Sequence, residues 1–460
     1  MSRPVRRRPA PPVRHVHLGL GNFFRAHQAW YTHRAPDGAG WGIAAFSGMG
    51  EGAAPVLAAQ DGVYTLVARG QRDDVELVES VVRAHVAGDA QAWAAYLADP
   101  AVTLLTCTVT EAGYRLGADG RPVPGDPAVG ADVAALRSGA GAPVTAAGRV
   151  VAGLAARRAA DAGRLDVVSC DNLPGNGAAV AAAVLGIAEQ VDPGLHAWAR
   201  EHVTFVGTMV DRITPRPTPA DVERLRALTG VDDPAVVVTE PYAEWVLDAA
   251  LTRERPAWEA AGALVTPDVE RFETRKLRLL NGAHSLLAYA GLVRGHTTVA
   301  EAVADDALVD DVRRWWSDAA RHLDFPPAEV AAYTDRLLER FGNPAIVHRL
   351  DQIAADGSQK IPARFGATLV VERAAGREGA GALQAVAAWL RYLRTTDAPV
   401  ADVAADRVVA AARTGGWHDA ARALLAEVDG ALADDRGAVE AVAERARALA
   451  VPAGRTSGTR

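Results

Sequence analysis

The segment RHVHLGLGNFFRAHQAWYTHRA, residues 14–35, decides which fold this sequence predicts. It begins as a short apolar strand, turns at Gly19-Leu20-Gly21 and continues with helix-forming residues. Glycines at such a turn let the backbone approach a pyrophosphate, and the N-terminus of the following helix favours bound phosphates. The usual third glycine is missing, because Phe24 occupies its position. The turn therefore indicates a dinucleotide site, and a purely structural turn is the alternative.

Strand-like and helical segments alternate along the chain after this turn. Segments rich in β-branched residues predict strands at 41–47, 102–110, 165–171 and 202–211, a hairpin within 63–86, and a strand before a helix within 235–247. Helical patterns occupy 89–100 and 145–163, and another helix follows 172–177. This alternation predicts an α/β fold, a Rossmann-type doubly wound sheet with mostly parallel strands.

Strand-like segments are missing from the later part of the sequence, where one helical pattern follows another. We therefore expect a mostly α-helical C-terminal domain after the Rossmann-type domain. The expected division is a disordered arm at 1–13, the dinucleotide-binding domain at 14–266, the helical domain at 267–450 and a disordered tail at 451–460.

Composition excludes several classes of function. The formal net charge of −7 argues against a nucleic-acid partner or an anionic membrane surface, and no long charge-free apolar run predicts a membrane span. Only two cysteines are present, Cys107 and Cys170, with no metal-type spacing, so we expect no metal and a reducing, cytoplasmic location. The motifs GxSxG, HExxH, CxxC and GxxxxGK[ST] do not occur.

Lysine is very rare in this chain, where Lys and Arg together number 49 and only Lys276 and Lys360 are lysines. Arginine stays protonated in a protein, whereas the pKa of a buried lysine can fall until it accepts a proton. The segment ETRKLRLLNGAHSLLAYAG, residues 273–291, contains Lys276 in a helix that is apolar nearly all round. Such a helix is expected to be buried.

The polar residues of this helix suggest a reaction. On a regular helix Glu273, Lys276, Asn281 and His284 lie within an arc of roughly 140°. Asn172 ends a predicted strand, where α/β sheets present ligand-facing side chains. Two amide donors around a neutral lysine suit an alcohol that loses its proton while a hydride leaves. A surface pair of Glu273 and Lys276 beside a satisfied core histidine is the alternative.

Six segments, in this order, resemble the mannitol dehydrogenase family of long-chain polyol-specific dehydrogenases, which includes mannitol 2-dehydrogenases and the fructuronate and tagaturonate reductases. They are GLGNFFRAHQAWYT (19–32), TVTEAGY (108–114), SCDNLPGNG (169–177), TMVDRITP (208–215), KLRLLNGAHSLLAY (276–289) and DGSQKIP (356–362). The resemblance runs from about residue 14 to beyond residue 440, and its K-x4-N-x2-H pattern is specific. It implies a Rossmann-type domain, a helical domain and a metal-free active site.

The resemblance also implies roles for individual residues. Lys276 corresponds to the general acid–base, and Asn172 and Asn281 correspond to the pair that binds the oxyanion. His284 would position the substrate, Glu273 would line a path for the departing proton, and Asp211 would orient the catalytic groups. The residues expected at the cofactor are Gly19, Gly21, Asn22, Phe23, Arg25, Glu51 and Thr110.

Two departures from the family pattern bear on ligands. Phe24 stands where many members have histidine, which puts a polar contact near the cofactor in doubt but leaves the turn intact. Mannitol-oxidising members tend to have arginine at position 352. This chain has Gln352 there, as the hexuronate reductases do, and this favours a sugar-acid substrate. Lys360 would then bind a distal hydroxyl or carboxylate, unless it is a lysine of a surface loop. No arginine directly follows the second strand, which favours NAD over NADP.

The sequence therefore predicts an NAD-dependent enzyme that interconverts an open-chain sugar alcohol or aldonate and its 2-keto sugar. A non-catalytic NAD-binding sensor with the same fold is the alternative, although a sensor has no need of a base. Kinship with the β-hydroxyacid dehydrogenases is disfavoured, because their lysine and asparagine lie closer together than in K-x4-N. The sequence does not reveal the oligomeric state.

Overall fold

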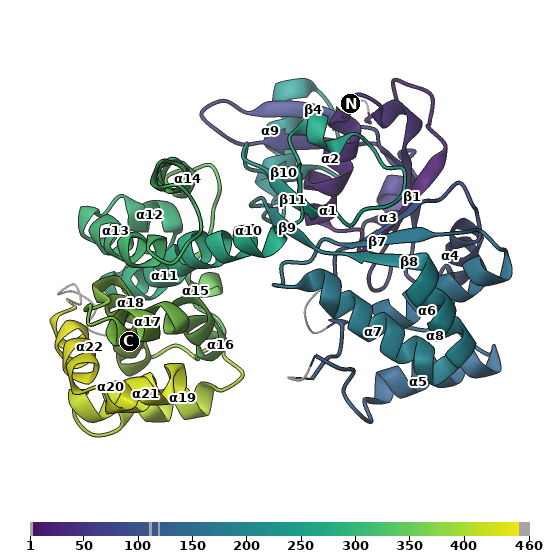
Figure 1. Ribbon diagram of the computed structural model, residues 1–460. Coiled ribbons are helices and arrows are strands. Elements are labelled where there is room, and N and C mark those ends of the chain that lie inside the picture. Colours follow the sequence, from purple (N-terminus) through teal and green to yellow (C-terminus); the bar gives the residue numbers. More distant parts are fainter. Residues whose placement is uncertain (1–2, 110–112, 118–119, 450–460) are drawn as a thin grey trace, which may run out of the picture. The chain divides into compact units, whose positions relative to one another are not determined.

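The computed structural model of the protein describes residues 3–109, 113–117 and 120–449, so the predicted cofactor residue Thr110 lies outside the described residues (Figure 1). The chain forms two compact units, Met1–Phe272 and Glu273–Arg460. The sequence-based boundary between residues 266 and 267 lies slightly earlier. It coincides with the last strand, whereas the division between the units falls inside the helix α10, Val269–Arg275.

The first unit contains the predicted doubly wound sheet. Six parallel strands pair in the order β5-β2-β1-β6-β7-β8, the classic order of dinucleotide-binding folds, which confirms the predicted fold class. These strands are β1 Val13–Leu18, β2 Gly42–Phe46, β5 Val81–His85, β6 Leu104–Cys107, β7 Leu165–Ser169 and β8 Val203–Val206. The order reverses between β1 and β6, and ligands of such sheets bind at the carboxyl ends of the strands beside this reversal.

Nine α-helices, α1 to α9, accompany the strands among the described residues of this unit. They are α1 Asn22–Ala26, α2 Gln28–Arg34, α3 Ala54–Ala58, α4 Ala90–Leu97, α5 Pro127–Ser138, α6 Ala146–Ala159, α7 Asn176–Val191, α8 Pro193–His202 and α9 Pro219–Thr229. Figure 1 shows α6, α7 and α8 beside the β7–β8 edge of the sheet.

Both faces of the parallel sheet are buried. Val16 and Leu18 of β1 belong to a core that includes side chains of α4, α6 and α7, whereas Ile43 and Ala45 of β2 belong to a second core. Successive side chains of a strand point to opposite faces, so two such cores require a sheet that is covered on both sides. Parallel sheets are nearly always covered in this way.

The predicted hairpin is confirmed in β3 (Tyr64–Ala68) and β4 (Asp74–Val78), which pair antiparallel, but it does not extend to residue 86, because β5 pairs with β2 instead. Two other sequence-based assignments of strands were wrong. The segment 202–211 is not one strand but β8 and β9 (Thr208–Asp211), which lie in different sheets. The segment 235–247 contains two strands, β10 (Val237–Thr239) and β11 (Glu244–Asp248), and no helix.

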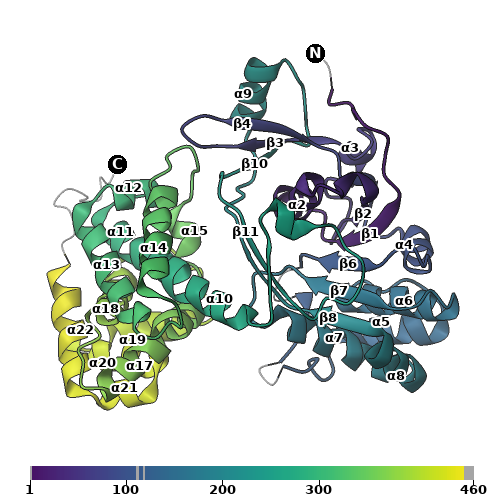
Figure 2. The same ribbon diagram turned by 45° about the horizontal axis from the view of Figure 1, so that its top comes forward.

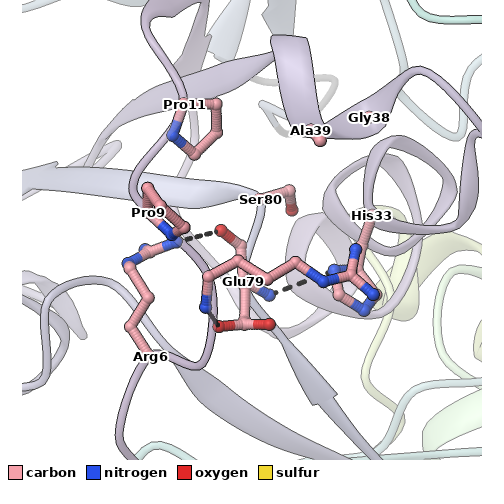
Figure 3. A pocket seen from close by; sticks show the side chains of 9 residues that line it. Arg6, Pro9, Pro11, His33, Gly38, Ala39, Glu79 and Ser80 are labelled. Atoms are coloured by element: carbon pink, nitrogen blue, oxygen red, sulfur yellow. Dashed lines mark hydrogen bonds between the residues drawn. The ribbon is translucent and has the colours of Figure 1, made fainter.

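The N-terminal arm also differs from the expectation of disorder. Within the described residues from 3 onward, Arg6 donates a 2.6 Å hydrogen bond to the Glu79 carbonyl, and the Arg7 amide donates to the Glu79 carboxylate at 2.5 Å. Figure 3 shows the arm passing Glu79, with His33 on the other side of a small cavity. The cavity measures about 30 Å³, which accommodates water but not a sugar.

The second unit is helical throughout its described residues, as the sequence predicts. After α10 come α11 Gly282–Arg294, α12 Val299–Val303, α13 Asp306–Ala320, α14 Pro327–Phe341, α15 Leu350–Ile353, α16 Gly357–Ile361, α17 Ala367–Ala374, α18 Ala380–Thr395, α19 Ala405–Arg413, α20 Trp417–Val428, α21 Gly430–Asp434 and α22 Arg436–Ala448. The buried helix α18 contacts α11, α13 and α22 (Figure 2).

Two short π-helical segments interrupt this unit. The first π turn, Lys276–Asn281, joins α10 to α11 in one continuous helical run, and the second π turn, Pro362–Gly366, joins α16 to α17 in the same way. The helix predicted over 273–291 is therefore present, but its hydrogen bonding is not regular. Such widened turns are rare and often occur at functional sites.

Within the described ranges, no helix is both long and apolar enough to cross a membrane. The same ranges contain no group of three or more histidine, cysteine or acidic side chains arranged to hold a metal ion. Cys107 and Cys170 are both free and buried.

Candidate active site

The glycine turn lies at the carboxyl end of β1 and is fixed by hydrogen bonds. The amides of Gly19 and Leu20 each donate to the carbonyl of Phe46 at 2.9 Å, and the Thr108 hydroxyl donates to the Gly19 carbonyl at 2.9 Å. Gly19 has φ +117°, and a Cβ there would lie 2.1 Å from the Thr108 carbonyl oxygen. At Gly21 a Cβ would meet only the Gly19 carbonyl, at 3.7 Å. The turn therefore leaves Gly21 open for a ligand, as a dinucleotide requires.

Phe24 explains the first departure from the family pattern. Its side chain is fully buried and stacks on the imidazole of His17, with ring centroids 3.5 Å apart. His17 also hydrogen-bonds to the hydroxyls of Thr106 and Thr108 at 2.7 and 3.1 Å. Position 24 thus faces the interior beneath the turn, where an aromatic ring supports it by packing.

The other predicted cofactor residues follow the turn or the second strand. Arg25 donates to the Asn22 side chain at 2.6 Å, to the Gly21 carbonyl at 3.2 Å and to the carbonyl of Ala235. Its guanidinium is buried and holds the first turn of α1 in place. The predicted continuous helix breaks at His27 into α1 and α2.

Two further predicted residues lie close to the turn or beyond β2. Phe23 is half-buried and stacks on His27, with ring centroids 5.0 Å apart. Glu51 is exposed in the loop after β2, and its carbonyl accepts a 2.7 Å hydrogen bond from Ser47. Its exposed carboxylate leaves Glu51 available to a ribose.

Asp171, beside the predicted oxyanion residue, is one of the residues that sequence reasoning left without a role. Its carboxylate accepts hydrogen bonds from the Ser169 hydroxyl at 2.7 Å, from Tyr114 and from the Val109 amide. Burial raises the pKa of Asp171 to about 6, although these donors oppose the rise. Asp171 thus ties the end of β7 to the segment after β6, and Asn172 follows with an exposed side chain.

Asn176 is a second such residue. Its amide group donates to the carbonyls of Asp171 and Thr208 at 2.8 and 2.7 Å and accepts from the Thr208 amide at 2.9 Å. It therefore fixes the loop that carries Asn172. The rarity of asparagine, with five in the chain, is a signal that applied to Asn176 as much as to Asn172.

Asp211 is the last residue of β9 and is buried, paired in register with Glu244 of β11. The strand end fixes its backbone in the first unit. The remaining predicted catalytic residues belong to the second unit.

Lys276 and Asn281 are the first and last residues of the first π turn. Hydrogen bonds in a π-helix join residues five apart, so this spacing stacks Asn281 above Lys276 by one turn. The arc expected for a regular helix does not apply here. Lys276 is 8% exposed, so it is buried as predicted, and Glu273 is half-buried in the last turn of α10.

Two indole groups support the first π turn from α13. Trp315 donates to the carbonyl of Arg278 at 2.7 Å, and Trp316 donates to that of Leu279 at 2.8 Å. A Cβ at Gly282 would lie 2.4 Å from the Trp315 ring nitrogen, so only glycine allows this approach. Side chains that bond to helix carbonyls in this way accompany irregular helical turns.

His284 is 6% exposed, and its Nε2 atom is buried with no hydrogen-bond partner among the described residues. The rings of His348 and Phe341 lie 4.9 and 4.6 Å away. Burial, followed by nearby cations, lowers the pKa of His284 well below its usual value, so the imidazole is neutral near pH 7. The alternative of a surface pair beside a satisfied histidine therefore does not fit, because Lys276 is buried and His284 is unsatisfied.

Lys360 is half-buried at the end of α16, and its ammonium donates a 3.2 Å hydrogen bond to the Ile353 carbonyl. Gln352 is exposed in α15, directly before Ile353. The structure thus brings Lys360 close to the backbone next to Gln352. Burial, and then the charge of Arg364, lowers the pKa of Lys360.

Comparison with known proteins identifies the family of both parts of the chain. Family models described as the mannitol dehydrogenase Rossmann domain and the mannitol dehydrogenase C-terminal domain match residues 13–260 and 268–450. D-mannonate oxidoreductase of Escherichia coli (strain K12) is 36% identical over 393 residues, which cover 83% of this chain and 80% of that protein. D-arabinitol 4-dehydrogenase of Ralstonia nicotianae is 38% identical over 372 residues, which cover 77% of each chain.

A solved structure of Pseudomonas fluorescens mannitol 2-dehydrogenase, a ternary complex with NAD and D-mannitol, is similar over nearly the whole chain. The TM-score is 0.80 at 33% sequence identity, and the match covers 96% of this chain and 92% of that chain. Both domain models together span almost all described residues, and the relatives are similar over most of their length. The chain therefore belongs to the mannitol dehydrogenase family.

Proposed function

We propose that the protein is an NAD-dependent dehydrogenase that interconverts an open-chain sugar alcohol or aldonate and its 2-keto sugar. The observation that carries the proposal is the first π turn, in which a buried lysine lies one turn below an asparagine. The relatives named above act on mannonate, arabinitol and mannitol according to their names, which supports this substrate class.

In the proposed reaction the chain's own residues bind the reacting hydroxyl and move its proton. The neutral amine of Lys276 takes the hydroxyl proton, and the amide groups of Asn172 and Asn281 stabilise the negative charge that develops on the oxygen. The neutral His284 donates or accepts a hydrogen bond at a neighbouring hydroxyl. Glu273 passes the proton from the lysine to water, and Asp211 helps to orient these groups.

A nicotinamide coenzyme, when bound, would supply the hydride acceptor for the oxidation of the carbinol carbon. The glycine turn would hold its pyrophosphate at Gly21, because the backbone there is open on the side where a Cβ would stand. The exposed carboxylate of Glu51 would bind the ribose of NAD, and it would repel the 2′-phosphate of NADP.

Alanine at the two glycines should have different effects. Gly19→Ala forces a Cβ against the Thr108 carbonyl at φ +117°, so we expect a loss of about 1–3 kcal/mol in the free energy of unfolding as well as weaker NADH binding. In Gly21→Ala the new Cβ makes only an ordinary van der Waals contact within the protein, so stability should change little. The Cβ occupies the side proposed for the pyrophosphate, so NADH affinity should fall at least about tenfold. Fluorescence titration and urea unfolding measure the two effects. Unchanged NADH affinity in Gly21→Ala would contradict the proposed pyrophosphate position.

The substrate is best identified by following NADH absorbance with mannitol, arabinitol, sorbitol and mannonate, each with NAD and NADP. Half-buried Lys360, which bonds to the carbonyl of the residue after Gln352, favours mannonate, because a lysine binds a carboxylate more strongly than a hydroxyl. Turnover of mannonate alone would support a sugar-acid substrate, and turnover of hexitols alone would exclude it. Coenzyme binding with no turnover of any polyol or aldonate would favour the alternative, a non-catalytic NAD-binding sensor with the same fold.

A further inference from the structure

The first π turn is held by a third side chain in addition to the two indoles of α13. Arg364 donates from its Nη1 atom to the carbonyl of Asn281 at 2.9 Å and to the hydroxyl of Ser285 at 2.6 Å. The change from i→i+4 to i→i+5 bonding alters which carbonyls find partners inside the helix. An external donor at Asn281 therefore stabilises the end of the widened turn, where the oxyanion residue is located.

Arg364 comes from the second π turn, and its own position has a local cause. This π turn begins with Pro362, which lacks an N–H donor and clashes with the carbonyl four residues before it in a regular helix. The irregular helix presents Arg364 to the first π turn, and the two π turns are in contact. Burial lowers the pKa of Arg364 to about 10, so the guanidinium remains charged near neutral pH.

We propose that Arg364 is a positioning residue that locks the first π turn, so that Lys276 and Asn281 face one reacting oxygen. This inference rests on the proposed function. Through the Asn281 carbonyl the guanidinium fixes the backbone that carries one oxyanion donor, and through Ser285 it fixes the next turn, which carries His284. A displacement of about 1 Å at a reacting centre can cost about 10²-fold in rate, so a backbone contact that prevents it affects catalysis without touching substrate.

The test compares Arg364→Met with Arg394→Met as a matched control. Arg394 also lies in the second unit and donates to two backbone carbonyls, those of Ala412 at 2.8 Å and Gly415 at 3.1 Å. Both variants lose guanidinium hydrogen bonds to backbone carbonyls, so both should lose stability. We expect only Arg364→Met to lower kcat, by at least about 30-fold, with a change in KM below about threefold.

Hydrogen exchange measured by mass spectrometry supplies a readout independent of turnover. In Arg364→Met the amides of residues 277–286 should exchange faster than in the wild type, whereas Arg394→Met should leave them unchanged. Ser285→Ala removes one of the two acceptors and leaves the contact with the Asn281 carbonyl, so its kcat should fall by less than that of Arg364→Met. Arg364→Lys keeps the charge but replaces the Nη1 atom that donates to both acceptors by a compact ammonium on a flexible stem, so its kcat should lie between those of the wild type and Arg364→Met.

Equal kcat in Arg364→Met and Arg394→Met would overturn the inference. If Arg364→Met does not fold, Arg364→Lys decides in its place, because a kcat within twofold of the wild type would overturn the inference and a clear loss would support it. If the wild type turns over none of the four substrates, the proposed function fails. The inference about the π turn is then decided by hydrogen exchange alone, and unchanged exchange in residues 277–286 would overturn it.

Discussion

Replacement of Lys276 by alanine is expected to lower turnover by at least about 10³-fold while NADH binding stays nearly unchanged. A positioned general base contributes about 10²–10⁴-fold to the rate. The truncation also removes a side chain next to the negative charge that develops on the substrate oxygen. Coenzyme affinity should persist because the glycine turn belongs to the other unit of the chain. Steady-state kinetics and fluorescence titration measure the two effects separately.

Lys276→Arg is the matched variant, because it keeps a positive charge on a long side chain but cannot lose a proton. It should therefore be nearly as inactive as the alanine variant. A small primary amine added to Lys276→Ala should restore part of the turnover, with a dependence on pH that follows the neutral amine. Activity of Lys276→Ala within tenfold of the wild type would remove the lysine from its proposed role.

The second large effect is expected at Glu372, a buried carboxylate of the second unit that is paired with three side chains. It lies in α17 with a fully buried side chain. Arg321 donates to it at 2.6 Å, Arg377 at 2.8–3.0 Å, and His322 lies within 2.6 Å of the same carboxylate. The hydrogen bonds from Arg377 and Arg321 hold the pKa of Glu372 well below its usual value.

Glu372→Gln should lower the free energy of unfolding by about 2–3 kcal/mol near pH 7. Removing one member of a buried ion pair leaves its partners uncompensated, and the effect stays moderate because both guanidinium groups are partly exposed. Urea unfolding followed by circular dichroism measures this loss. Glu378→Gln is the control, because Glu378 pairs with Arg445 at the surface and should cost less than about 1 kcal/mol.

The contribution of Glu372 should also depend on pH. Since its pKa is lower in the folded state than in the unfolded state, the stabilisation is complete above the unfolded pKa of about 4.3 and is lost as the pH falls through lower values. The wild type should therefore lose stability more steeply than Glu372→Gln between about pH 5 and pH 3. Parallel curves of melting temperature against pH for the two proteins would show that Glu372 carries no such linkage.

Much of the first unit could be predicted from local patterns. The buried strand before Gly19 and the alternation of strands and helices predicted a doubly wound sheet, and the observed strand order has this topology. Pairing partners were less predictable, because β5 and β9 have the same local pattern as the strands preceding them but join different sheets. The residue pattern of a strand specifies which of its side chains face a core. The strand with which it pairs depends on the rest of the sheet.

The sequence by itself determined the glycine turn, the end of β9 that carries Asp211, and the buried lysine in a chain where arginine supplies nearly all other cations. The tertiary structure alone decided that Lys276 and Asn281 stand at the two ends of a π turn. No proline or glycine within Lys276–Asn281 requires such a turn. Its carbonyls are bonded instead by Trp315, Trp316 and Arg364, which lie more than 30 residues away in sequence. Side-chain donors brought together only by folding leave no periodic signal in the segment that they shape.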